Sequence, residues 1–227
     1  MTVEEKRSIS REFPTYKIES DPESDLLIDR SSIERQARQF VYHFVKELPK
    51  LHKPIFIWLR DGAEMFSQDL QTAFKKVMQE VEFVGVNYKL YEGMVARAQA
   101  ELDETEFPFP DVAGRAVILV DDVADTIKTA HSFIGQVQER GGTVTDAVFM
   151  VEKPESSPWR SQIREKPWPK NIRKWSLFAV DDLWLQGNGM DTNGIGREDP
   201  NVIWRRDMEP QKVEYFRRKR RGLPVTA

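Results

Sequence analysis

The sequence contains, at residues 117–129, the segment VILVDDVADTIKT. Its four apolar residues are typical of a buried strand. Three acids follow closely, at Asp121, Asp122 and Asp125. The other polar residues of the segment are Thr126, Lys128 and Thr129. Open α/β sheets bind ligands in the crevice outside the carboxyl ends of their strands. Acids beside phosphate-binding groups at such a position therefore indicate a ligand that carries phosphates, hydroxyls and a metal ion.

The surrounding sequence predicts alternating helices and strands. Helical spacing of apolar residues predicts a helix from Ser31 to about Leu48, with Ser31–Glu34 as a capping box. Further helices are expected to contain residues 66–77 and 133–137, each with apolar residues on one face. Strands are expected at residues 55–59, 81–88, 143–151 and 175–180, and residues 154–174 read as a loop. This alternation predicts a parallel sheet with helices on both faces.

Three regions of the chain differ in composition. Residues 1–28 are acidic and polar with little periodicity, which predicts an irregular N-terminal arm. Residues 29–205 are expected to form one α/β domain, in which the long polar loop at about 91–113 is a candidate lid. Residues 206–227 form a basic tail that contains RRKRR. Such a run can bind nucleic acid, but a solvated or inter-subunit face is the preferred interpretation of a short run after a helix.

The overall composition indicates a compact protein without disulfides. The chain has 227 residues, 40% of them hydrophobic, and a net charge of −3. Nearly balanced charge argues against a nucleic acid partner, and no apolar run approaches the length of a membrane span. Cysteine is absent, which excludes disulfides and thiolate metal sites. With a polar start from Met1 to Pro14, a cytoplasmic location is expected.

The segment at 117–129 resembles the phosphoribosyl pyrophosphate (PRPP) motif of the type I phosphoribosyltransferases. In that family an apolar strand precedes two acids, two further residues and Asp-Thr-Gly-x-Thr. Asp121 and Asp122 match the acidic pair, and Asp125, Thr126 and Thr129 match the loop. Ile127 stands where the family has glycine. A β-branched residue avoids positive φ, so we expect either a negative φ at Ile127 or weakened phosphate binding.

A second segment resembles the base-binding segment of the hypoxanthine-guanine phosphoribosyltransferases. The matching positions are Trp184, Gly187, Asp191 and Arg197. Together the two matches cover roughly residues 50–205 and imply the type I phosphoribosyltransferase fold. In that fold a mainly parallel central sheet is flanked by helices, and a small hood region binds the base.

The resemblance also implies which residues contact the base and the pyrophosphate. Trp184 would stack on a purine, and the backbone of Leu185 would read the base edges. Lys153, at the end of a predicted strand, would donate to the oxo group of a 6-oxopurine. Arg60 stands where the family has a lysine in its pyrophosphate loop, and its guanidinium can bind phosphate oxygens. Asp61 is unusual there, because a carboxylate repels pyrophosphate unless a metal intervenes.

The remaining roles implied by the resemblance concern ribose, phosphate and metal. Asp121 and Asp122 would hold the ribose hydroxyls, directly or through metal-bound water, and Asp125 would act as general base near N7 of the purine. The loop of Thr126, Ile127, Lys128 and Thr129 would surround the 5-phosphate. Arg197 would lie beside the pyrophosphate. The cofactor implied is Mg²⁺, with Asp121, Asp122 and Asp191 as candidate ligands.

These matches favour a purine phosphoribosyltransferase that transfers the phosphoribosyl group of PRPP to hypoxanthine, guanine or xanthine. PRPP and the purine base would be its ligands, and association into a homo-oligomer, a dimer or tetramer, is expected. A phosphoribosyltransferase for another base is the first alternative. The second is a regulatory protein on the same fold that senses PRPP or a nucleotide without turnover.

Overall fold

A parallel six-stranded sheet forms the centre of the molecule. The computed structural model describes residues 13–92, 95–102, 104, 107–155, 157 and 167–225. The strands of the sheet are β1 (Tyr16–Lys17), β3 (Ile55–Leu59), β4 (Glu82–Val86), β7 (Ala116–Ala124), β8 (Thr143–Glu152) and β9 (Arg173–Ala179). Their order is β1-β9-β8-β7-β3-β4, and every neighbouring pair is parallel. The predicted parallel sheet is confirmed.

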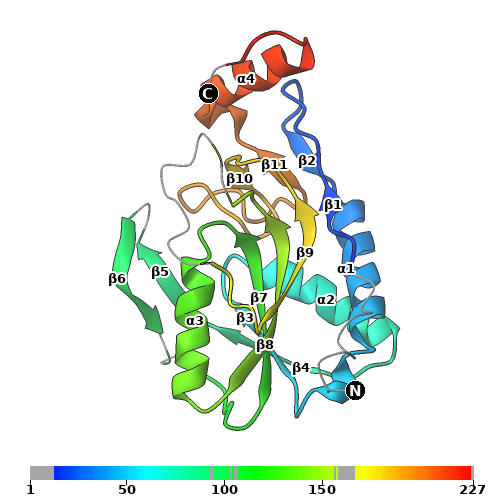
Figure 1. Ribbon diagram of the computed structural model, residues 1–227, viewed down its shortest axis with the longest axis vertical. Helices are drawn as coiled ribbons and strands as arrows, with labels where there is room; N and C mark the ends of the chain where they lie inside the picture. The colour runs from blue at the N-terminus through cyan, green and yellow to red at the C-terminus, as the bar shows by residue number, and fades with distance from the viewer. Residues whose placement is uncertain are drawn as a thin grey trace, which may run out of the picture.

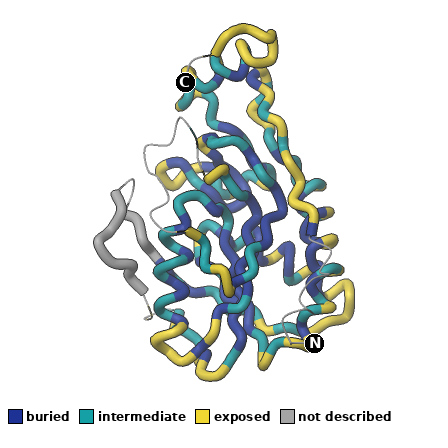
Figure 2. Tube along the Cα trace, in the orientation of Figure 1, coloured by how far each residue is buried: buried dark blue, intermediate teal, exposed yellow. Residues whose placement is uncertain are grey.

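Helices cover both faces of this sheet (Figure 1). They are α1 (Arg30–Phe44) and α2 (Glu64–Lys76) on one face and α3 (Lys128–Glu139) on the other. Side chains alternate along β7, so that Ile118 and Val120 belong to the core beneath α1 and α2. Val117 and Leu119 belong to the core beneath α3. The run of apolar residues is therefore explained by burial on both faces, which Figure 2 shows as a dark centre.

The first helix begins earlier than the sequence predicted. Its N-cap is Asp29, whose Oδ1 accepts a hydrogen bond of 2.9 Å from the backbone N–H of Ser32. Hydrogen bonds from the hydroxyls of Ser31 and Ser32 lower the pKa of Asp29 to about 2. The predicted capping box at Ser31–Glu34 is thus wrong, because the aspartate two residues earlier satisfies the same free N–H groups.

A small antiparallel sheet lies beyond the carboxyl ends of the central strands and forms the hood (Figure 1). Its strands are β2 (Leu26–Ile28), β10 (Leu185–Gln186) and β11 (Val202–Trp204), in the order β10-β11-β2. The helix α4 (Pro210–Arg220) follows, and the 3₁₀ turns are η2 (Leu48–Lys50) and η3 (Arg206–Met208). The position of a hood next to the strand ends agrees with the predicted architecture.

The prediction of an irregular arm at residues 1–28 is wrong for two stretches. Strand β1 extends the central sheet by pairing with β9, and β2 pairs with β11 in the hood. Both strands are very short, so neither has enough residues to show an alternating pattern in the sequence. Backbone pairing to a strand that is already ordered, rather than local propensity, accounts for them.

A second difference concerns the polar segment at about 91–113. Strands β5 (Tyr88–Glu92) and β6 (Val95–Leu102) pair in an antiparallel ladder, where the sequence predicted a loop. Residues 93, 94, 103, 105 and 106 of that segment lie outside the described residues. The role of the segment as a lid stays a prediction.

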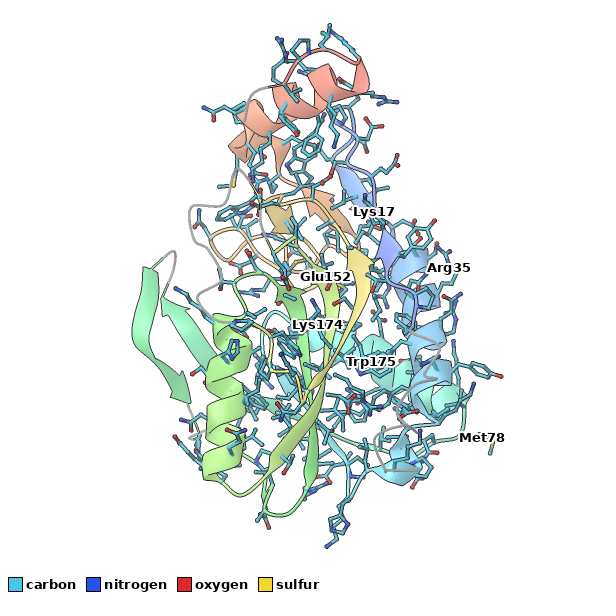
Figure 3. The ribbon with its side chains drawn as sticks, in the orientation of Figure 1. Lys17, Arg35, Met78, Glu152, Lys174 and Trp175 are labelled. Carbon is cyan, nitrogen blue, oxygen red and sulfur yellow. The ribbon has the colours of Figure 1, made fainter. Side chains whose placement is uncertain are left out.

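Polar pairs join neighbouring parts of the structure. Lys174 of β9 and Glu152 of β8 form an ion pair of 2.9 Å (Figure 3). Glu152 is the last residue of β8, whereas Lys174 is the second residue of β9. Arginines of the basic tail pair with acids of the arm, as in Arg217 with Glu23 and Arg220 with Asp21, each at 2.8 Å. None of the helices described here is long and apolar enough to cross a membrane.

Candidate active site

The acidic pair lies at the carboxyl end of β7, where the central sheet faces the hood. Asp121 is buried and Asp122 half-buried. Burial and the adjacent charge of Asp122 raise the pKa of Asp121 well above its usual range. Burial also raises the pKa of Asp122, against the opposing effect of a hydrogen bond from the backbone N–H of Val123. Two adjacent carboxylates that are removed from water are unfavourable for the isolated protein, which is typical of a functional site.

The loop after the acids turns directly into α3. Its residue Ile127 has a φ of 57° and precedes the first helical residue, Lys128. The alternative of a negative φ at Ile127 is therefore wrong. The side chain is only 5% exposed and belongs to the core that also contains Phe133. Apolar burial thus holds an isoleucine in a conformation that usually requires glycine.

Lys153 and Asp125 approach each other from adjacent strands. The ammonium of Lys153 lies 3.1 Å from Oδ2 of Asp125. The backbone N–H of Lys153 donates to the carbonyl of Ala124, which places the lysine next to the end of β7. The Lys153 side chain is 13% exposed and that of Asp125 is 41% exposed. Lys153, a candidate donor to an oxo group, and Asp125, a candidate general base, are therefore close together.

The loop after β3 passes beside the acidic pair. A Cβ on Gly62 would lie 2.3 Å from Oδ2 of Asp122, so only glycine fits there without a shift. The guanidinium of Arg60 lies 3.5 Å from the ring centroid of Phe107 and lines the same cleft as the acids. Asp61 is exposed, has a φ of 71° and lies outside the described lining of the cleft. The carboxylate expected to disfavour pyrophosphate is therefore not part of the described lining of the cleft.

The hood supplies an aromatic ring at the other side of the cleft. Trp184 is 36% exposed, and its indole N–H donates to the hydroxyl of Thr192 at 3.0 Å. Leu185 is buried, and its strand β10 pairs with β11 at Trp204. Of these two predicted base-binding residues, Trp184 lines the cleft and the Leu185 side chain does not.

Asp191 and Arg197 form an ion pair within the hood. Nη2 of Arg197 lies 2.6 Å from Oδ1 of Asp191, and Nη1 donates to the carbonyl of Gly189 at 2.6 Å. A Cβ on Gly189 would lie 1.9 Å from the carbonyl oxygen of Gly62. The hood loop and the loop after β3 are therefore in direct backbone contact. Asp191 lines the cleft, whereas Arg197 is not part of its described lining.

No ready-made metal site is present in the described part of the chain. No three side chains of histidine, aspartate or glutamate there are close enough to hold an ion, so Asp121, Asp122 and Asp191 do not form a preorganised set. Mg²⁺ retains several waters and commonly uses one or two carboxylates together with substrate phosphates. The carboxylates of Asp121 and Asp122 at the cleft fit such an ion, and the metal assignment stays a prediction.

All these elements surround one cleft of about 950 Å³. Most of the predicted site residues line it, namely Arg60, Asp121, Asp122, Asp125, Thr126, Ile127, Thr129, Lys153, Trp184 and Asp191. Lys128 lies in the first turn of α3, outside the described lining. Charged residues of the lining that the sequence analysis missed include Asp182, Glu209 and Lys212. The last two belong to the basic tail, where no local pattern indicated a place in the site.

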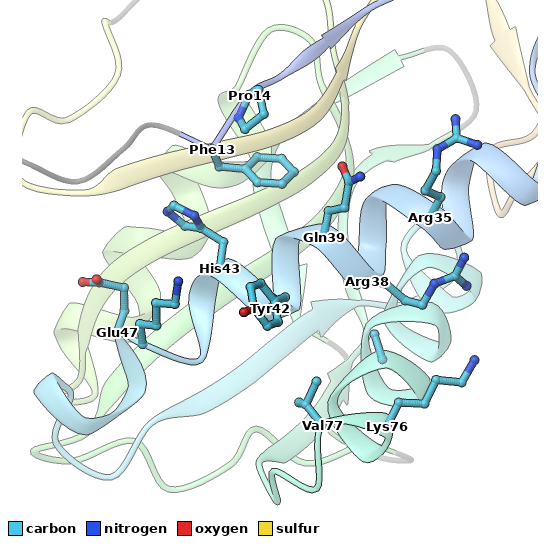
Figure 4. A pocket seen from close by; sticks show the side chains of 12 residues that line it. Phe13, Pro14, Arg35, Arg38, Gln39, Tyr42, His43, Glu47, Lys76 and Val77 are labelled. Atoms are coloured by element: carbon cyan, nitrogen blue, oxygen red, sulfur yellow. The ribbon is translucent and has the colours of Figure 1, made fainter.

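A second hollow lies on the outer side of α1 and α2 (Figure 4). Its lining includes Arg35, Arg38 and Lys76, together with Tyr42, which is 67% exposed. It is separate from the acidic cleft and contains none of the predicted site residues. The acids, the phosphate loop and the aromatic ring therefore point to the other cleft as the candidate active site.

Comparison with known proteins gives a curated relative that matches part of the chain. No protein-family model matches the chain. The orotate phosphoribosyltransferase of Methanopyrus kandleri is 32% identical over 103 residues, which are 45% of this chain and 53% of that protein. The chain thus matches about half the length of this curated relative.

Solved structures of hypoxanthine phosphoribosyltransferases resemble the whole domain. The Staphylococcus aureus protein has a TM-score of 0.66 at 14% identity, covering 82% of this chain and 94% of that one. The Trypanosoma cruzi protein in complex with the product IMP has a TM-score of 0.65 at 18% identity, covering 82% and 96%. The chain therefore has the type I phosphoribosyltransferase fold, as its sequence motifs predicted.

Proposed function

We propose that this chain is a phosphoribosyltransferase that uses PRPP and a 6-oxopurine to form a nucleoside monophosphate and pyrophosphate. The observation that carries the proposal is the meeting of the acidic pair, the Asp125–Lys153 pair and Trp184 in one cleft. These groups come from two strand ends and the hood, at the place where this class of sheet binds ligands.

Each group has a chemical task in this reaction. Asp121 and Asp122 accept hydrogen bonds from the ribose hydroxyls, and bound Mg²⁺ would neutralise part of the pyrophosphate charge. The backbone N–H groups at the start of α3 and the hydroxyls of Thr126 and Thr129 contact the 5-phosphate. Asp125 takes the proton from N7 of the purine as N9 attacks C1 of the ribose and the bond from C1 to the pyrophosphate breaks. Positive charge that develops on the sugar is stabilised by the surrounding carboxylates.

Two groups define the base. The indole ring of Trp184 gives a planar surface on which a purine can stack. The ammonium of Lys153, beside Asp125, donates to an oxo group at C6, whereas the 6-amino group of adenine would present another donor to it. This combination favours hypoxanthine, guanine or xanthine over adenine.

Orotate is the second candidate, and the match to an orotate phosphoribosyltransferase favours it. Orotate carries a carboxylate, which the Lys153 ammonium could pair with as readily as with an oxo group. The stacking surface of Trp184 suits either ring.

Binding without turnover is the remaining alternative, in which the chain would act as a PRPP or nucleotide sensor. The predicted homo-oligomer and cytoplasmic location also stay predictions.

The decisive experiment is a PRPP-dependent assay with hypoxanthine, guanine, xanthine, adenine and orotate in the presence of Mg²⁺. Turnover of a 6-oxopurine that is lost in Asp125→Asn supports the proposal. Turnover with orotate alone would mean that the substrate is a pyrimidine and not a purine. PRPP binding without consumption of any base would favour the sensor.

A further inference from the structure

The C-terminal helix α4 contributes to the base end of the cleft. Glu209, its N-cap residue, and Lys212, in its first turn, line the same cleft as Lys153 and Trp184. Both lie in the tail, beyond the part of the sequence that resembles a known base-binding segment. α4 is held on the hood by Phe216, whose ring meets that of Trp204 edge to face at 5.6 Å.

The carboxylate of Glu209 is the centre of a half-buried hydrogen-bond cluster. Its Oε2 accepts from the backbone N–H of Trp184 at 2.7 Å and from the indole N–H of Trp204 at 2.9 Å. Its Oε1 pairs with the ammonium of Lys212 at 2.7 Å, and both side chains are only 13% exposed. Lys212 also donates to the carbonyl of Asp182. The N-cap residue of α4 therefore holds the backbone of Trp184 in place.

The indole ring of Trp184 is fixed from the opposite side. Its N–H donates to the hydroxyl of Thr192, a residue that is 6% exposed. With the backbone N–H bonded to Glu209 and the ring N–H bonded to Thr192, both N–H groups of this partly exposed residue have a side-chain acceptor. Two such restraints define the plane of the ring, and the plane sets how well a flat base can stack.

We propose that Glu209, supported by Lys212, is a positioning residue that sets the affinity of the site for the base through Trp184. The proposal rests on the proposed function, because it concerns the base of that reaction. It assigns to α4 a role in recognition of the base, while the PRPP end of the cleft is built without it. Loss of the Glu209 carboxylate therefore weakens binding of the base much more than binding of PRPP.

Glu209→Gln tests this with almost no change of shape. An amide has one oxygen, so it cannot accept from the two tryptophan N–H groups and from Lys212 together. In one orientation of the amide, its oxygen still accepts from the two tryptophan N–H groups, but its NH₂ group then faces the ammonium of Lys212. In the other orientation, the oxygen faces Lys212 and both hydrogen bonds from the tryptophans are lost. A charge-assisted hydrogen bond of this kind corresponds to roughly tenfold or more in affinity.

The measurement compares KM for the base, KM for PRPP and kcat in the wild-type chain and three variants. Glu214→Gln is the matched control, since Glu214 is an exposed acid on the same helix. Thr192→Val removes the other acceptor of Trp184 and keeps the test open if Glu209→Gln fails to fold. We expect KM for the base to rise about tenfold in both Glu209→Gln and Thr192→Val, with KM for PRPP unchanged within about twofold.

The outcomes separate the two proposals. A wild-type chain that turns over no base overturns the proposed function and this inference with it. Turnover by the wild type with an unchanged base KM in Glu209→Gln, or with equal changes in the base and PRPP constants, overturns only the positioning role. A rise in base KM in Glu214→Gln as large as in Glu209→Gln would also overturn it, because simple loss of charge on α4 would then explain the effect.

Discussion

Ile127 gives a test in which two effects on stability oppose each other. The residue has a φ of 57°, where glycine is favoured, but its side chain is 5% exposed and packed in the core beneath α3. Ile127→Gly removes both the backbone strain and the apolar side chain. Ile127→Ala removes most of the side chain and keeps the strain. The two variants therefore separate the energy of the backbone from that of the packing.

The structure sets the expected order of stabilities. Removing a buried isoleucine side chain costs about 2–5 kcal/mol in the free energy of unfolding. A non-glycine residue in the left-handed region costs roughly 1–2 kcal/mol, which the alanine variant still bears. Greater freedom of glycine in the unfolded chain offsets part of that gain, by roughly 0.5–1 kcal/mol. We expect the native chain to be the most stable, the glycine variant next by a deficit of a few kcal/mol, and the alanine variant last.

Urea unfolding followed by far-ultraviolet circular dichroism measures this order. The matched control is Ile134, which is 6% exposed in the middle of α3. There Ile134→Ala should be more stable than Ile134→Gly by about 1 kcal/mol, because glycine is unfavourable inside a helix. The ranking of glycine and alanine should thus reverse between the two positions. An alanine variant at 127 as stable as the glycine variant would refute the idea that the core holds Ile127 in a strained conformation.

Two further predictions concern the acidic pair and the loop beside it. Gly62→Ala would force its Cβ into Oδ2 of Asp122, and the resulting shift should lower kcat/KM for PRPP about 10²-fold. Gly135→Ala, in open space on α3, is the control that should leave it unchanged. Asp121→Asn should abolish turnover but raise the melting temperature at neutral pH. Because the folded-state pKa of Asp121 is raised, its ionisation destabilises the wild type as pH rises above about 4, so the gain should vanish at lower pH. Equal gains across the pH range would contradict burial as the cause.

The features that the sequence predicted well depend on local patterns. The apolar run at 117–120, followed by acids, predicts the same arrangement in any parallel sheet. A strand buried on both faces must be apolar, and acids toward its carboxyl end lie beside the crevice in which such sheets bind ligands. The same is true of Lys153, whose place follows from the end of the next strand. A parallel sheet with these strands as neighbours is therefore enough to bring the motif residues together.

The features that the sequence missed depend on contacts between distant segments. Glu209 and Lys212 reach the cleft only because α4 packs on β11 through Phe216 and Trp204. Nothing in the basic tail itself distinguishes these two residues from their charged neighbours. The short strands β1 and β2 were missed for a related reason, since each is defined by the strand with which it pairs.

The position of the acidic pair argues for a ligand more strongly than any single residue does. Asp121 and Asp122 are adjacent and removed from water, and their pKa values are raised. Their ionisation therefore lowers the stability of the isolated folded protein. The backbone contacts of Gly62 and Gly189 close one loop against another beside these acids, with no room for a side chain. A chain that needed only stability would replace the carboxylates with apolar residues. Such an arrangement is explained if polyhydroxylated, metal-bound PRPP provides the missing partners for both carboxylates.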